Sequence, residues 1–292
     1  LEEGYLIFNE RYWNERKRAL IFSKEYKKND CIIFGSSQIM TVSLNQKPKV
    51  LSRNCKSILN LGVSGAVIED YFALSNNINP KELKDKKIFL QIHPYTLNFN
   101  RDGRWLIYSD LFEEFLKKIN YRNLVLNNPE NLEFEKVSKL VKNLTSYDYL
   151  KSSLQFLFNS RKDNIKVVSK LKNSDEKSKK IILFDGSFKE VIKKKQKLIL
   201  ESKKINHRIF KDKWFDKNVL KLILSYKKYY EEKNEIIFLL TPYHPEVWKL
   251  KNEPIVEAMI RVEKKIHEFA KTNKMSVIGS FKPENLGCKR ND

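Results

Sequence analysis

Five short apolar runs constrain the fold of this chain more than any other feature of its sequence. Each run is rich in hydrophobic residues and is followed within two residues by a glycine or a proline, and the second run is the weakest of the five. Runs of this kind are typical of strands buried on both faces of a parallel sheet. The predicted strands are Cys31–Phe34, Ser57–Leu61, Lys87–Ile92, Glu235–Leu240 and Met275–Ile278.

Stretches with helical spacing separate several of these strands. We predict helices over residues 66–74, 218–232 and 253–273. The third has an apolar stripe made of Ile255, Met259, Val262, Ile266 and Phe269. Strands that alternate with helices imply βαβ units with right-handed crossovers. The predicted fold class is therefore a three-layer α/β/α, flavodoxin-like domain with a mostly parallel sheet.

The 292 residues are sufficient for one large α/β domain with an insertion. Residues 1–28 mix aromatic and charged side chains and are predicted to form one or two helices that lead into a domain over 29–292. The segment from about 99 to 234 is too long for one crossover. We predict a largely helical insertion there, with helices at 111–119 and 132–144 and one strand-like run at 180–184.

The formal net charge of +21 comes almost entirely from lysines spread along the chain. No Arg-rich stripe and no nucleic-acid motif accompanies it, so no nucleic-acid partner is predicted. No run of about 18 apolar residues is present that could span a membrane. Cys31, Cys55 and Cys288 form neither a CxxC pair nor a metal-ligand spacing, and no metal or cofactor is predicted. Their odd number argues against a disulfide framework, although one bridge or none are both compatible with it, and Cys31 is expected to be buried and inert.

Small residues, hydroxyls and histidines follow the predicted strands. In doubly wound sheets, ligands bind beyond the carboxyl ends of the strands, so we expect a site at this edge. The segments that meet there are Gly35-Ser36-Ser37-Gln38, Gly62-Val63-Ser64-Gly65, His93-Pro94-Tyr95, Thr241-Pro242-Tyr243-His244 and Gly279-Ser280-Phe281.

Four blocks of the sequence carry a resemblance to a known family. Ile33-Phe34-Gly35-Ser36-Ser37 resembles the first block of the SGNH (GDSL-type) hydrolase superfamily, which is usually Gly-Asp-Ser after a buried strand. Asn60-Leu61-Gly62-Val63-Ser64-Gly65 resembles the second block, Asn-x-Gly-x-x-Gly. The segments at His93, Asp185 and Thr241 are similar to motifs of a bacterial branch that acylates or deacylates cell-envelope polysaccharides. Gly279-Ser280-Phe281-Lys282-Pro283-Glu284 resembles the approach to the last block.

The resemblance implies roles for particular residues. Ser37 matches the nucleophile, Ser36 replaces the usual aspartate, and the backbone N–H groups of Ser37 and Gly65 match the donors of the oxyanion hole. We expect a strand-to-helix turn at Gly35 to expose the Ser37 hydroxyl at a helix N-terminus. Candidates for lining the cleft are Ser36, Asn60, His93, Tyr95, Asp185 and His244, each of which also has a purely structural explanation.

Two departures from the family pattern stand out. The third block usually supplies an Asn side chain to the oxyanion hole, whereas this chain has His93-Pro94-Tyr95. The last block, Asp-x-x-His, is missing before the chain stops at Asp292. We expect the chain to be a fragment whose domain is incomplete at its carboxyl end, with the catalytic Asp and His beyond residue 292.

The function implied by the resemblance is that of a serine esterase or O-acyltransferase acting on ester-linked acyl groups, chiefly acetyl, of a cell-envelope carbohydrate. The expected partner is a carbohydrate or an acylated small molecule, outside the cytoplasm, with a membrane anchor upstream of Leu1 as one arrangement. The alternative is a catalytically inactive SGNH-like domain that binds glycan or acts as a scaffold, which the missing Asn favours. A third hypothesis, a phosphate or nucleotide site at the Gly35 turn, lacks the Gly-x-Gly-x-x-Gly pattern.

Overall fold

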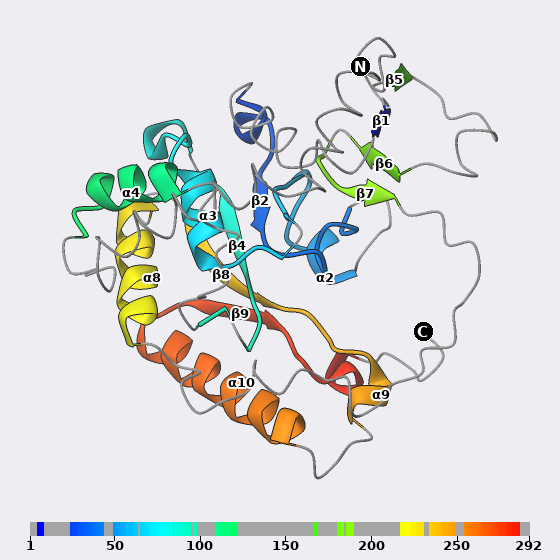
Figure 1. Ribbon diagram of the computed structural model, residues 1–292, viewed down its shortest axis with the longest axis vertical. Helices are drawn as coiled ribbons and strands as arrows, with labels where there is room; N and C mark the ends of the chain where they lie inside the picture. The colour runs from blue at the N-terminus through cyan, green and yellow to red at the C-terminus, as the bar shows by residue number, and fades with distance from the viewer. Residues whose placement is uncertain are drawn as a thin grey trace, which may run out of the picture.

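A five-stranded, all-parallel sheet forms the centre of the protein (Figure 1). The structure is a computed structural model that describes residues 5–8, 24–43, 49–63, 65–83, 85–94, 96–97, 109–121, 166–168, 180–183, 185–189, 217–230, 234–248 and 254–286. The strands are β2 (Cys31–Phe34), β3 (Ile58–Asn60), β4 (Lys87–Ile92), β8 (Glu235–Leu240) and β9 (Ser276–Gly279). The predicted parallel sheet is confirmed, and β2, β4 and β8 have the predicted bounds.

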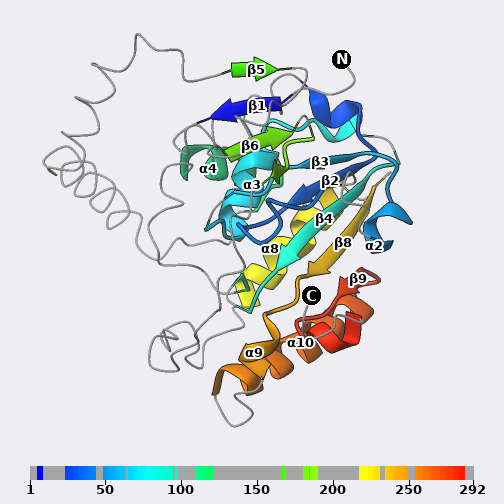
Figure 2. The same cartoon turned by 90° about the vertical axis from the view of Figure 1, so that its right-hand side faces the viewer.

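The strand order β3-β2-β4-β8-β9 determines which face each connecting helix covers. The chain reverses its direction across the sheet once, after β3, and a right-handed crossover then has to use the other face. Accordingly, α2 (Lys49–Ser52) packs on one face, while α3 (Ile68–Ser75), α8 (Lys217–Tyr230) and α10 (Pro254–Thr272) pack on the other (Figure 2). The α/β class is therefore confirmed. On the face of α2, the described cover consists of that short helix and the turn after β2.

The remaining described helices and turns are short, apart from the ten-residue helix α4 (Ser109–Lys118). The others are α9 (Pro245–Trp248) and the 3-10 turns η2 (Glu25–Lys27), η4 (Pro80–Glu82) and η8 (Pro283–Leu286). Among the described ranges, no helix combines the length and the apolar composition that crossing a bilayer would need.

A cluster of aromatic rings holds α3, α4 and α8 together as one layer. Phe72 of α3 stacks on Tyr226 of α8 at 4.6 Å between ring centroids and on Phe115 of α4 at 5.7 Å. All three rings are buried, and each buried aromatic side chain removes a large apolar area from water. The smaller cluster on the opposite face contains Ile33 of β2 and Phe89 of β4.

A second sheet, antiparallel and with the order β5-β1-β6-β7, lies beside the β3 edge of the first (Figure 2). Its strands are β1 (Tyr5–Phe8), β5 (Lys166–Val168), β6 (Lys180–Leu183) and β7 (Phe188–Lys189). The prediction of helices over 1–28 is therefore wrong at Tyr5–Phe8, because these residues find their hydrogen-bond partners in the insertion. The insertion also needs correction, since its described part has three strands besides α4 and α8. The helix expected at 132–144 lies outside the described residues.

A disulfide bond joins Cys31, the first residue of β2, to Cys55 in the loop that leads into β3. Their Cα atoms are 5.8 Å apart, which is a normal spacing for a disulfide. The expectation of an inert Cys31 thiol is thus corrected. Cys31 is buried as expected, but the parallel pairing of β2 with β3 brings the loop before β3 close enough for Cys55 to reach it.

We predict that reducing this disulfide lowers the free energy of unfolding by about 3 kcal/mol, because the unfolded chain regains the entropy of an open loop. The two cysteines are 24 residues apart in sequence. Urea unfolding with and without a phosphine reductant measures the difference. A Cys31→Ala/Cys55→Ala variant is the control, since its stability should not respond to the reductant. Equal stability of the oxidised and reduced wild-type protein would contradict the prediction.

Candidate functional site

The turn after β2 places two consecutive serines in opposite environments. Ser36 is 1% exposed, whereas Ser37 is exposed to solvent. Backbone bonds from Ile39 to Ser36 (3.2 Å) and from Met40 to Ser37 (3.3 Å) close consecutive turns over this segment. The helix expected directly after Gly35 is absent from residues 37–43, so the predicted helix N-terminus beneath Ser37 needs correction. The exposed position of Ser37 is therefore created by tight turns.

Ser36 is anchored to two polar residues of β4 and its end. Its hydroxyl lies 2.7 Å from Nε2 of His93 and 3.1 Å from Oε1 of Gln91. Its backbone N–H donates to the same Gln91 oxygen at 2.6 Å. Buried polar groups are normally satisfied in this way, because leaving one unpaired costs about 1–3 kcal/mol. Ser36 thus supports the turn from below.

Gln91 also reaches the end of β8. Its Nε2 donates to Thr241 Oγ1 at 2.8 Å and to Gln38 Oε1 at 3.3 Å, and Thr241 donates to the same Gln38 oxygen. Thr241 belongs to a segment predicted to lie at this edge, whereas Gln91 is not among the predicted site residues. The signal available for Gln91 was a single amide side chain inside the otherwise apolar end of a predicted strand.

Asn60 fastens the loop after β3 to the turn after β2. Its Nδ2 donates to the carbonyls of Ile39 (2.6 Å) and Val42 (2.9 Å), and its Oδ1 accepts the Gly62 N–H at 2.9 Å. A Cβ on Gly62 would lie 2.9 Å from Cγ1 of Ile39, so glycine permits this close packing. The second-block motif therefore has a structural role here, because Asn-x-Gly holds two loops together.

Gly65, the predicted second donor of the oxyanion hole, is half-buried and has a φ of 68°. This left-handed conformation favours glycine over every residue with a Cβ. Ser64 beside it lies outside the described residues.

The turn between β6 and β7 brings Asp185 against the same loops. The Asp185 carboxylate accepts from Ser43 Oγ at 2.6 Å and from the Ser187 N–H at 2.8 Å. Its backbone carbonyl accepts the Asn60 N–H at 2.6 Å and so caps the edge strand β3. Asp185 is half-buried and belongs to the wall that fixes the turn after β2.

The residues predicted to line the cleft differ in their exposure to solvent. Ser36, Asn60 (0% exposed) and His93 (0% exposed) are buried, so the expectation that they line a cleft is corrected to a supporting position beneath the turn. His244 is exposed at the same sheet edge, after β8. Tyr95 lies outside the described residues.

His93 is kept neutral by its surroundings. Burial lowers the pKa of His93 to about 4, because desolvation disfavours the imidazolium. Its backbone N–H donates to Thr96 Oγ1 at 3.0 Å, and the Tyr243 ring stands edge-on to the imidazole at 6.4 Å. At neutral pH His93 is thus an uncharged hydrogen-bonding group.

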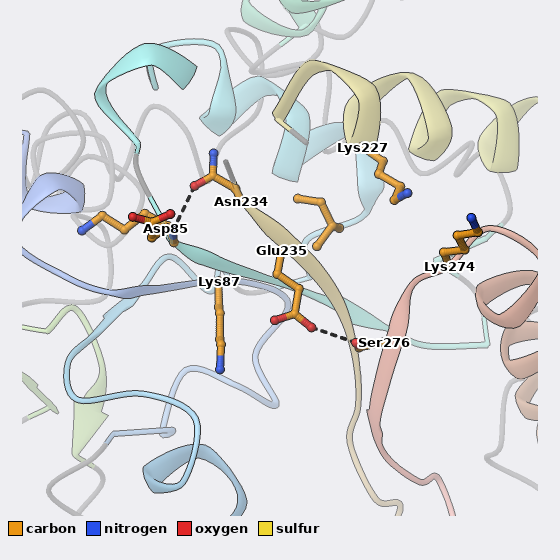
Figure 3. A pocket seen from close by; sticks show the side chains of 9 residues that line it. Asp85, Lys87, Lys227, Asn234, Glu235, Lys274 and Ser276 are labelled. Carbon is orange, nitrogen blue, oxygen red and sulfur yellow. Dashed lines mark hydrogen bonds between the residues drawn. The ribbon is translucent and has the colours of Figure 1, made fainter. Parts of the chain in front are cut away.

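A pocket of about 440 Å³ lies at the opposite edge, where β4, β8 and β9 begin (Figure 3). Its wall contains Lys86, Lys87, Lys227 and Lys274 together with Asp85 and Glu235. Several of these groups are already bonded: Lys86 Nζ donates to the Lys27 carbonyl at 2.9 Å, and Glu235 accepts from Ser276 at 2.8 Å. The pocket lies between residues at the amino ends of these strands, whereas Ser37 lies at the carboxyl end of β2.

Comparisons with protein-family models, with curated proteins and with solved structures found no match. In the described part of the chain, no three His, Cys, Asp or Glu side chains are grouped so that they could hold a metal ion. The assignment of a function therefore depends on the residues at the carboxyl edge of the sheet.

We predict that His93 makes stability depend on pH in the acid range. The folded protein keeps His93 neutral down to a pKa of about 4, whereas the unfolded chain takes up the proton near 6.5. Its contribution is therefore complete above pH 6.5 and is lost as the pH falls to 4, a change of about 3 kcal/mol. Urea unfolding of the wild type and of His93→Gln between pH 7 and 4 measures this difference. Parallel pH profiles for the two proteins would refute it.

Proposed function

We propose that this chain is a serine hydrolase or acyltransferase of the SGNH type, with Ser37 as its nucleophile on a flavodoxin-like sheet. The observation that carries the proposal is the contrast between the two serines at the end of β2: Ser36 is buried and bonded, and Ser37 is exposed. A nucleophilic hydroxyl needs an exposed and rigidly held position. When the five parallel strands are numbered along the chain, their order across the sheet is 2-1-3-4-5. This is the strand order of flavodoxin, and it supports the proposed scaffold.

The proposed reaction is acyl transfer through a covalent intermediate. Ser37 Oγ forms a bond to the acyl carbon of an ester and gives its proton to a base, while the carbonyl electrons move to the oxygen. The N–H groups of Ser37 and Gly65 stabilise this oxyanion, and one such donor contributes about 3 kcal/mol to the transition state. Collapse of the intermediate expels the alcohol oxygen, which takes the proton from the base. Water or a sugar hydroxyl then removes the acyl group from Ser37.

The base of this reaction is not the histidine that lies beneath the turn. His93 bonds Ser36 and is fully buried, so it has no access to an incoming ester. The proposal takes the base, and the acid that orients it, from residues outside the described part of the chain.

The proposed substrate is an acylated carbohydrate of the cell envelope, and the proposed location is outside the cytoplasm. The Cys31–Cys55 disulfide supports the location, because such bonds form and persist in oxidising compartments. The substrate class follows from the resemblance of the strand-end motifs to envelope acylation proteins, which is an argument by analogy.

A second candidate function is a glycan-binding domain without catalysis. His93 stands where the family supplies an oxyanion-stabilising Asn, and its ring is directed to Ser36 inside the protein. His93 therefore does not provide that donor, which favours a binding role over chemistry.

We predict that a fluorophosphonate probe labels the complete protein at Ser37. Ser37→Ala should reduce labelling by at least about 10³-fold, because the attacking oxygen is removed. Intact-mass spectrometry after a timed exposure measures the adduct. Ser276→Ala is a matched control, since Ser276 is also an exposed serine but lies at the opposite edge of the sheet. Labelling that persists in Ser37→Ala would refute the nucleophile, and an unlabelled wild type that binds glycan would favour the second candidate.

A further inference from the structure

We propose that Gln91 is the positioning residue for Ser37, an inference that rests on the proposed function. Gln91 lies in β4 and is 0% exposed, between Leu90 and Ile92. A primary amide inside an apolar strand is unfavourable unless its hydrogen bonds are made. In the described part of the chain, the hydrogen-bond partners of the Gln91 side chain belong to the turn after β2 or to the end of β8.

The hydrogen bonds fix which end of the amide faces which partner. The Ser36 backbone N–H can only donate, so the Gln91 oxygen has to face Ser36. The NH₂ group then faces Thr241 and Gln38, as observed. The side chain therefore has one orientation. If the amide were reversed, its NH₂ group would face the Ser36 N–H at 2.6 Å, and two donors would point at each other.

The same rule orders the groups on both sides of Gln91. When Ser36 Oγ–H donates to Gln91 Oε1, the hydroxyl accepts from Nε2–H of His93. At the other end, Thr241 Oγ1 accepts from Gln91 and donates to Gln38. With this tautomer of His93, all of these donors point in one direction, from the interior toward the surface beside Ser37.

Gln91 holds both neighbours of Ser37. It accepts from the backbone and side chain of Ser36 on one side, and it donates to the side chain of Gln38 on the other. A Cβ at Gly35 would lie 2.5 Å from the Gln91 oxygen, so the glycine of the motif leaves room for this amide. One buried side chain therefore determines the path of the turn that carries the exposed hydroxyl.

Such a position matters for rate, because a nucleophile displaced by about 1 Å can lose about 10²-fold in reactivity. Gln91→Met keeps the length of the side chain and removes every hydrogen bond. Leu90→Met is the matched control, since it introduces the same residue at the neighbouring buried position of β4, which makes no side-chain hydrogen bond. Thr241→Val is a milder variant, because it removes only the two bonds made by Thr241 Oγ1 and leaves Gln91 bonded to Ser36 and Gln38.

The experiment measures turnover of a small acetyl ester and fluorophosphonate labelling on the complete protein, at a temperature where circular dichroism shows every variant folded. We expect Gln91→Met to lower kcat about 10- to 100-fold relative to Leu90→Met with KM changed less than twofold, and Thr241→Val to lower kcat less. Amide hydrogen exchange of residues 36–40 should be faster in Gln91→Met than in Leu90→Met.

The outcomes separate this inference from the proposed function. If Ser37→Ala abolishes labelling but Gln91→Met and Leu90→Met have equal kcat, Ser37 keeps its role and the positioning role of Gln91 is overturned. If the wild type is never labelled at Ser37, the proposed function fails. In that case hydrogen exchange decides alone: equal exchange of residues 36–40 in the two variants overturns the inference, and faster exchange in Gln91→Met supports Gln91 as the residue that holds the turn.

Discussion

The arrangement of the site depends on polar groups at the carboxyl ends of β2, β4 and β8 that bond to one another. The parallel register aligns Phe34 with Leu90, and Leu90 with Phe238, so the residues that follow these positions meet at one edge. Ser36, Gln91 and His93 are buried there, and leaving a buried polar group without a hydrogen bond costs about 1–3 kcal/mol. The sheet therefore specifies the network, and the network specifies the turn that carries Ser37.

The turn after β2 is fastened at both of its ends by different parts of the fold. Gln91 holds the residues on either side of Ser37, whereas Asn60 binds the carbonyls of Ile39 and Val42. Ser43, at the far end, donates to Asp185 of the second sheet. Between these attachments the Ser37 hydroxyl faces solvent. A short exposed segment on a rigid support is the arrangement that both acyl transfer and specific binding require.

Much of the parallel sheet could be predicted because its signal is local. Continuous apolar runs gave the bounds of β2, β4 and β8, and amphipathic spacing located α8 and α10 within a few residues. The second sheet could not be predicted in this way, because Tyr5–Phe8 becomes a strand only through pairing with Lys180–Leu183. The Cys31–Cys55 bond likewise depends on the pairing of β2 with β3, which no spacing of cysteines reveals.

In the candidate site, too, residues that belong to a local motif could be predicted, and residues that act through long-range contacts could not. Ser37, Gly65 and the supporting residue Asn60 were accessible through a motif, since each lies a fixed distance after a predicted strand. The role of Gln91 was not accessible, because in the sequence Gln91 is one amide in an apolar run. Its function appears only when Ser36 and Thr241, which come from different strands, are placed beside it.

These long-range contacts also connect the site to the folding of the whole chain. Gln91 and Thr241 are 150 positions apart, and Ser43 and Asp185 are 142 positions apart. The entropy of closing such loops has to be overcome before either contact contributes. The full set of contacts that fixes the turn after β2 therefore exists only when β8 is docked on β4 and the β6–β7 turn lies at the β3 edge.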